Sequence, residues 1–141
     1  MRANELMIGD WVYSAFTISE LPCKITCLKN HEGEYTSIET TNVIGVTDIA
    51  SLSPIPLTTE ILEKNGFKPY IPENHLETVY ACQDVSKAVA DELYALWPYR
   101  DGSFYLLLRV DGKDMVRMGV HYIHQLQHAL RLCGISKLIE L

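Results

Sequence analysis

The feature that most constrains the fold of this 141-residue chain is a proline-rich break, Pro54-Ile55-Pro56-Leu57. Each proline lacks a backbone N–H and biases the preceding residue towards extended conformations, so this segment predicts a connector. The sequence before it reads as short strands only, whereas the sequence after it mixes helical and strand patterns. We therefore expect a β-rich, barrel-like subdomain over residues 1–56 and an α+β subdomain over residues 57–141, packed together as one compact unit.

The first subdomain contains short apolar runs with a period of two, separated by turn residues, at positions 7–13, 23–28, 35–40 and 43–49. Four or five strands of this length, joined by tight turns, are typical of a small closed or strongly bent sheet. An SH3-like β-barrel is the specific prediction, and a curled antiparallel sheet is the alternative.

The second subdomain is expected to run helix, β-hairpin, helix and strand, which makes the whole chain α+β. Thr58 or Thr59 is placed to cap a short helix that ends before Gly66. The remaining predicted elements are a strand at 78–82, a helix at 84–97, a hairpin of 104–110 with 115–120 turning at Asp111-Gly112, a helix at 121–133 and a final strand at 136–141.

The net charge of −6 comes from 18 acidic and 12 basic residues, and the sequence contains no Lys/Arg cluster. Nucleic-acid binding is disfavoured, because it usually requires a basic face. We find no apolar leader and no run of about 18 apolar residues, so neither secretion nor a membrane span is expected. The four cysteines are then expected to be reduced, buried or half-buried thiols of a cytoplasmic protein.

Three of the five histidines, His121, His124 and His128, fall within the last predicted helix. At 100° per residue they lie on the side opposite its apolar residues. Imidazoles spaced i and i+4, with a third one turn away, could bind zinc or nickel. The simpler interpretation is a solvated face, since no HExxH-type general base accompanies them. No cofactor is predicted.

Two other groups of residues are candidates for function. Glu73, His75 and Glu77 share the loop after the first helix and could act as an acid–base pair, although such loops are usually only solvated. Trp11, Tyr13 and Tyr35 are aromatic residues of predicted strands, which could form part of the core or of a binding surface. No phosphate-binding glycine loop or nucleophile elbow is present.

Three segments taken together resemble a family of small uncharacterised proteins common in gut Bacteroidales and in their phages and mobile elements. They are NELMIGDWV at residues 4–12, PIPLTTEILEKNGF at 54–67 and HQLQH at 124–128. This chain has His128 where the family usually has Asn, and the family more often has strand and loop at 84–97. The resemblance implies no activity, but it marks His124, Gln125 and Gln127 as family-type residues and implies a phage or mobile-element context.

The sequence therefore favours a non-enzymatic binding or accessory protein that acts through protein–protein contacts. Trp11, Tyr13, Tyr35, His124 and Gln125 are its candidate binding residues. The alternative is a metal-dependent or acid–base enzyme built on the histidines of the last helix or on the loop at 73–77. A homodimer through the predicted hairpin edge or the histidine-bearing helix stays open.

Overall fold

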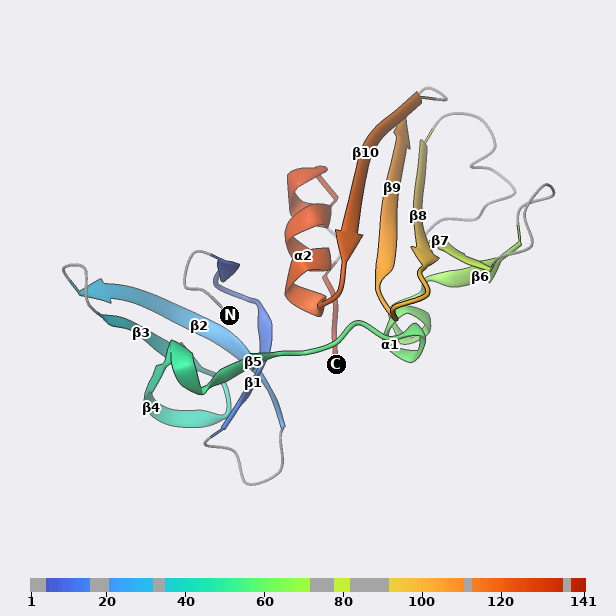
Figure 1. Ribbon diagram of the computed structural model, residues 1–141. Helices are drawn as coiled ribbons and strands as arrows, with labels where there is room; N and C mark the ends of the chain where they lie inside the picture. Colours follow the sequence, from blue (N-terminus) through green and yellow to red (C-terminus); the bar gives the residue numbers. More distant parts are fainter. Residues whose placement is uncertain are drawn as a thin grey trace. The chain divides into compact units, whose positions relative to one another are not determined.

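The computed structural model describes residues 5–15, 21–31, 35–71, 78–81, 92–110, 113–135 and 138–141. The chain divides into two compact units (Figure 1). Unit 1 comprises Met1–Pro56, Tyr122–Ile139 and Leu141, and unit 2 comprises Leu57–His121 and Glu140. Each unit contains a five-stranded antiparallel sheet, which confirms the predicted α+β class. The last helix belongs to unit 1, whereas the sequence had grouped it with residues 57–141.

The sheet of unit 1 is antiparallel throughout and has the order β4-β3-β2-β1-β5. Its strands are β1 (Trp11–Ser14), β2 (Pro22–His31), β3 (Tyr35–Thr40), β4 (Val43–Asp48) and β5 (Leu52–Pro54), with a 3₁₀ turn, η2 (Ile49–Ser51), before β5. Within the described residues, β4 and β5 end the order and do not pair with each other, so the sheet is not a closed barrel. The curled sheet is therefore the arrangement found.

The core of this sheet comes from alternate residues of its strands. Val12, Ile25 and Ile38 are essentially inaccessible, and Leu6 and Leu52 join them. The register of β2 shifts between Ile25 and Cys27, so strict alternation ends there.

The predicted burial of the thiols is confirmed for three cysteines. Cys23 is buried, and Cys27 and Cys133 are half-buried, all as free thiols. Burial raises the pKa of the Cys133 thiol, which disfavours the reactive thiolate. Cys82 lies outside the described residues.

Unit 2 is a meander in which strands adjacent in sequence are adjacent in the sheet, with the order β10-β9-β8-β7-β6. Its elements are α1 (Thr59–Lys64), β6 (Lys68–Tyr70), β7 (Val79–Ala81), β8 (Glu92–Pro98), β9 (Phe104–Val110) and β10 (Lys113–Val120). The predicted hairpin is confirmed as β9 and β10, while its turn at 111–112 lies outside the described residues.

Helix α1 has the start and stop signals that the sequence predicted. The Thr58 side chain accepts a hydrogen bond from the Ile61 N–H at 3.4 Å. Gly66 adopts a φ of 77° after the last turn, a conformation that favours glycine. The Phe67 N–H then donates to the Leu62 carbonyl at 3.0 Å, and both side chains are buried.

Two predicted elements of the second half are wrong. The helix expected at 84–97 is replaced, over its described part, by strand β8. Ala95 and Leu96 point to opposite faces of the sheet and are both fully buried. The apolar residues of β8 therefore do not alternate along the strand, and their pattern resembles the apolar stripe of a helix. The final strand is absent from residues 138–141, where Asn65 instead holds the Glu140 backbone through two hydrogen bonds of 2.8 and 2.9 Å.

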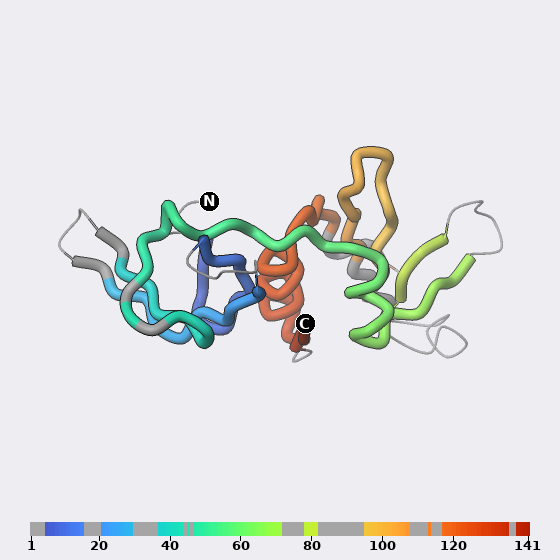
Figure 2. Tube along the Cα trace, turned by 90° about the horizontal axis from the view of Figure 1, so that it is seen from below, coloured from blue at the N-terminus to red at the C-terminus, as the bar shows by residue number. Residues whose placement is uncertain are grey.

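The helix of unit 1, α2 (Ile123–Leu132), begins where the chain returns beside the proline connector (Figure 2). Pro56 and Tyr122 form an antiparallel bridge, and the Ile123 N–H donates to the Ile55 carbonyl at 3.0 Å. The PIPL segment thus acts as a short strand partner for the residues that open α2.

Candidate functional site

Helix α2 is buried around more than half of its circumference, which the sequence did not reveal. Placing its residues 100° apart shows that the buried set extends well beyond one apolar stripe; it consists of Ile123, His124, Leu126, Gln127, Ala129 and Leu130. His124 is only 3% exposed, so the prediction of a solvated histidine face is wrong for this residue. The helix also begins two residues later than predicted, which leaves the exposed His121 outside it.

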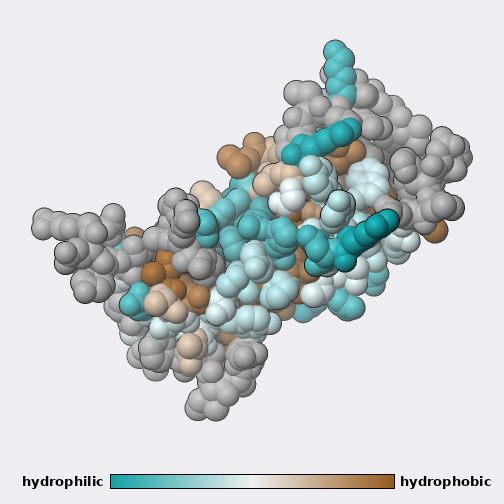
Figure 3. All heavy atoms as spheres, in the orientation of Figure 1, coloured by the Kyte–Doolittle hydropathy of each residue, from teal (hydrophilic) through white to brown (hydrophobic). Residues whose placement is uncertain are grey.

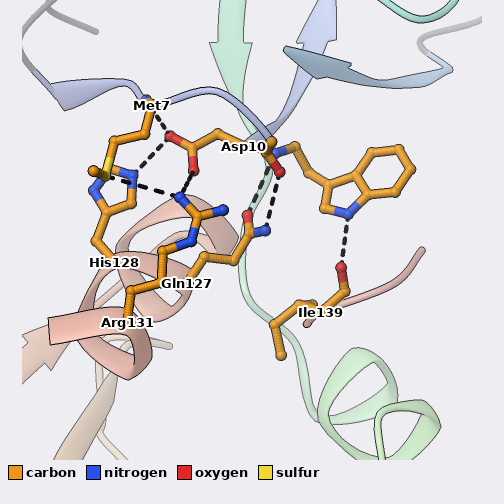
Figure 4. Close-up of polar contacts among 8 residues, drawn as sticks. Met7, Asp10, Gln127, His128, Arg131 and Ile139 are labelled. Carbon is orange, nitrogen blue, oxygen red and sulfur yellow. Dashed lines mark hydrogen bonds and ion pairs between the residues drawn. The ribbon is translucent and has the colours of Figure 1, made fainter. Parts of the chain in front are cut away.

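The most unusual group in unit 1 is the carboxylate of Asp10, which is completely buried at the start of β1 (Figure 4). Its Oδ2 accepts a hydrogen bond from the Met7 N–H at 2.7 Å and lies 2.7 Å from His128 Nε2. Its Oδ1 lies 3.8 Å from Arg131 Nη1. A buried carboxylate is tolerated only with partners of this kind, so the three groups on α2 and the preceding turn hold Asp10 in place.

The side-chain amide of Gln127 performs the role of a strand partner. Its Nε2 donates to the Gly9 carbonyl at 3.2 Å, and its Oε1 accepts from the Trp11 N–H at 3.4 Å. On the other side, Gly9 and Asp10 exchange backbone hydrogen bonds with Ile25 of β2. The first residues of β1 are therefore held between a strand and a glutamine, which satisfies backbone groups that burial would otherwise leave unpaired.

His124 lies beside this cluster and carries an unpartnered buried nitrogen. Its ring stacks on Tyr122, with centroids 5.8 Å apart and planes 7° apart, and it meets the edge of His128 at 5.9 Å. No described group hydrogen-bonds its Nδ1. Burial lowers the pKa of His124 most strongly; the Asp10 carboxylate opposes it with the next largest effect, and the nearby His128 lowers the pKa further. The imidazole is therefore neutral at neutral pH.

Two predicted aromatic binding residues share one face of β1. The half-buried Trp11 donates from its indole N–H to the Ile139 carbonyl at 2.8 Å, and Lys24 Nζ lies 4.8 Å from its ring centroid. Tyr13, two residues on, is also half-buried. Trp11 is therefore part of the packing that fixes the C-terminal segment.

The other predicted binding residues lie elsewhere in unit 1. Tyr35 opens β3 opposite His31, and its side chain is outside the described part. Gln125 accepts the Tyr122 N–H at 3.3 Å and so caps the start of α2, close to the buried His124.

The three-histidine metal site is not formed. Among the residues that the structure describes, no three His, Cys, Asp or Glu side chains converge so as to hold a metal ion. His128 Nε2 is engaged by Asp10. The loop candidates Glu73, His75 and Glu77 lie outside the described residues.

Comparisons with protein-family models, with curated proteins and with solved structures find no match to this chain. Among the described residues, no helix has the length and apolar character that a membrane span requires.

Asp10 is the central residue of the site that sequence reasoning missed. The only local signal was the Gly9-Asp10 turn before an apolar strand, and its partners His128 and Arg131 follow more than a hundred residues later. Chemically, the cluster is a buried carboxylate paired with a histidine whose side chain is 22% exposed. The contact between the two side chains fixes α2 against β1.

Proposed function

We propose that this chain is a non-enzymatic binding or accessory protein that acts in the cytoplasm by contact with another protein. The phage or mobile-element context of the proposal rests on the resemblance of the NELMIGDWV, PIPLTTEILEKNGF and HQLQH segments. The observation that carries the proposal is that strand β10 ends the sheet of unit 2 and pairs only with β9 among the described strands.

Strand β10 is the longest terminal strand of either sheet. It spans eight residues, pairs only with β9 among the described strands, and exposes Lys113, Arg117 and Gly119. A strand at the end of a sheet presents a row of backbone N–H and C=O groups that another extended chain can pair with. Many peptide-binding domains recognise their partners by adding a strand in this way.

Two of the other three sheet ends are less suited to strand addition. β6 and β5 have three residues each, and they contain Pro69 and Pro54. Proline removes a donor and is a common means of preventing edge pairing. The coloured residues on the face drawn in Figure 3 are mostly hydrophilic, with hydrophobic residues in separate patches. Both observations favour recognition through the β10 backbone over recognition through a broad apolar face.

The test is affinity capture with the full chain, with and without nuclease, followed by reconstitution of the complex from purified components. We expect a stoichiometric protein partner that survives nuclease treatment and that slows amide exchange within residues 113–120. Capture that requires nucleic acid, or protection confined to unit 1, would contradict the proposal.

A second candidate, an acid–base enzyme, is favoured by the contact of 2.7 Å between Asp10 and His128. In that case the two groups would be needed for turnover, and His128→Gln would abolish a reaction while leaving the affinity for the captured partner unchanged. If His128→Gln lowers stability alone, the pair serves only to position α2.

A further inference from the structure

Gly119 stands in β10 at a position where nothing local requires glycine. It is not among the glycines with positive φ, and a Cβ added to it would meet no atom within 4 Å. Glycine inside a strand costs stability, because it is conformationally free when unfolded and packs nothing when folded. Glycine in a strand often marks a place where a ligand or another backbone approaches closely. Here the open space lies on the surface of the sheet.

Gly119 ends a row of residues that crosses three strands. It pairs with Tyr105 of β9, which in turn pairs with Trp97 of β8. Residues directly opposite each other in a sheet point to the same face. Tyr105 is 44% exposed and Trp97 is half-buried, whereas in the next row on that face Leu107 and Ala95 are buried. The result is an exposed aromatic row that reaches the β10 edge with no side chain at its end.

We propose that β10 binds an extended segment of a partner protein whose residue opposite Gly119 is aromatic. A strand added about 4.8 Å from β10 would place that side chain beside Gly119, where the missing Cβ leaves room for the ring to extend to Tyr105. An aromatic residue opposite a glycine is a known means of covering the exposed backbone of a sheet. This inference rests on the proposed function and specifies the chemistry of the partner.

The charge of β10 specifies a second position of the partner. The exposed Arg117 precedes Gly119 by two residues, so both residues face the same side. The residue of the added strand that lies opposite Arg117 is therefore two positions from the aromatic one. A carboxylate there would complement the guanidinium, which predicts a pattern of acidic residue, any residue and aromatic residue, in an order set by the strand direction.

A single-stranded nucleic acid could also stack bases on exposed aromatic rings. The net charge of −6 favours a peptide. We therefore retain a nucleic acid only as an outcome of the test.

The test is selection of a randomised ten-residue peptide display library on the full-length protein, followed by affinity measurement with the selected peptides. The informative variant is Gly119→Val, because a β-branched residue in an open strand position should preserve or raise the melting temperature. The matched control is Ser53→Val, which adds the same side chain to an exposed position of another terminal strand, β5.

We expect selected peptides to contain an aromatic residue two positions from an acidic one. They should bind Ser53→Val as they bind the wild type, and bind Gly119→Val and Tyr105→Ala about tenfold more weakly, as loss of a ring contact implies. Peptides without the pattern, or with equal affinity for Gly119→Val, would overturn the inference and leave the proposed function standing. Preferential binding of an oligo(U) probe that Gly119→Val abolishes would overturn the choice of a peptide. Failure to select any peptide, together with failure to capture any protein, would overturn both proposals.

Discussion

Each of the two units is stabilised internally by a different kind of contact. In unit 2, neighbouring strands of the sheet are also neighbours in sequence, from β6 to β10. In unit 1, the start of β1 depends on contacts with residues more than a hundred positions later, such as the pair of Asp10 and His128, 118 residues apart. Contacts between distant residues require more chain entropy to be lost before they form. The comparison indicates that the stability of unit 1 depends on a few polar side chains, whereas the stability of unit 2 depends on the pairing of strands that are adjacent in sequence.

The largest expected effect is that of Asp10→Ala, which tests whether unit 1 depends on its buried carboxylate. The change leaves the Met7 N–H and the His128 side chain without their partner, so we expect a loss of about 3 kcal/mol in the free energy of unfolding. Hydrogen exchange should rise in β1 and α2 before it rises in β9 and β10.

The matched control is Asp48→Ala in the same unit, where an exposed carboxylate accepts the Ala50 N–H at 3.1 Å. Loss of this cap should cost about 1 kcal/mol or less in urea denaturation. Equal losses in the two variants would show that the contacts of Asp10 contribute no more than an ordinary surface cap.

A smaller effect is expected from pH, through the neutral His124. Burial lowers its pKa in the folded protein, so the unfolded chain binds more protons as the solution is acidified. Protonation of His124 therefore costs no stability above the unfolded pKa of about 6.5, and the free energy of unfolding falls as pH drops towards the folded pKa.

The variant His124→Leu should flatten the part of the stability curve that lies below pH 6.5. Its free energy of unfolding should also be about 1 kcal/mol higher than that of the wild type at pH 8, because the substitution removes a buried nitrogen that has no described partner. A curve for His124→Leu that matches the wild type would contradict the assigned role of His124.

The smallest expected effect is that of Thr58→Ala, which removes a local contact of unit 2. The hydrogen bond from Ile61 is long, 3.4 Å, so we expect a loss of only about 0.5 kcal/mol, with Thr58→Ser close to the wild type. The loss should appear as faster amide exchange in α1 alone. A loss as large as that of Asp10→Ala would remove the distinction between the two units.

The elements that the sequence predicted correctly are those with local signals. Thr58 and Gly66 bound α1, a period-two run marks β3, and the Asp111-Gly112 turn signal predicted the hairpin of β9 and β10. The prediction failed for the described part of 84–97, because a strand that is covered on both faces shows no alternation.

The candidate site was less predictable than the fold. His124 looked solvated because helical spacing reveals one apolar stripe and cannot show that a helix is buried on several sides. Asp10 carried only the weak signal of the Gly9-Asp10 turn, since its partners are fixed by the tertiary fold. Gln127 was marked only by the resemblance, and its role as a substitute for a strand partner depends on the position of Gly9 and Trp11.

The pairing at the proline connector determines which deletions and domain replacements the chain should tolerate. Pro56 and Tyr122 are bridge partners in unit 1, and the Leu57 N–H donates to the His121 carbonyl at 2.9 Å in unit 2. The segment 57–121 therefore leaves and re-enters unit 1 at adjacent positions, as an inserted domain does. A turn of a few residues could replace it in a deletion, and a different domain with close termini could be grafted in its place.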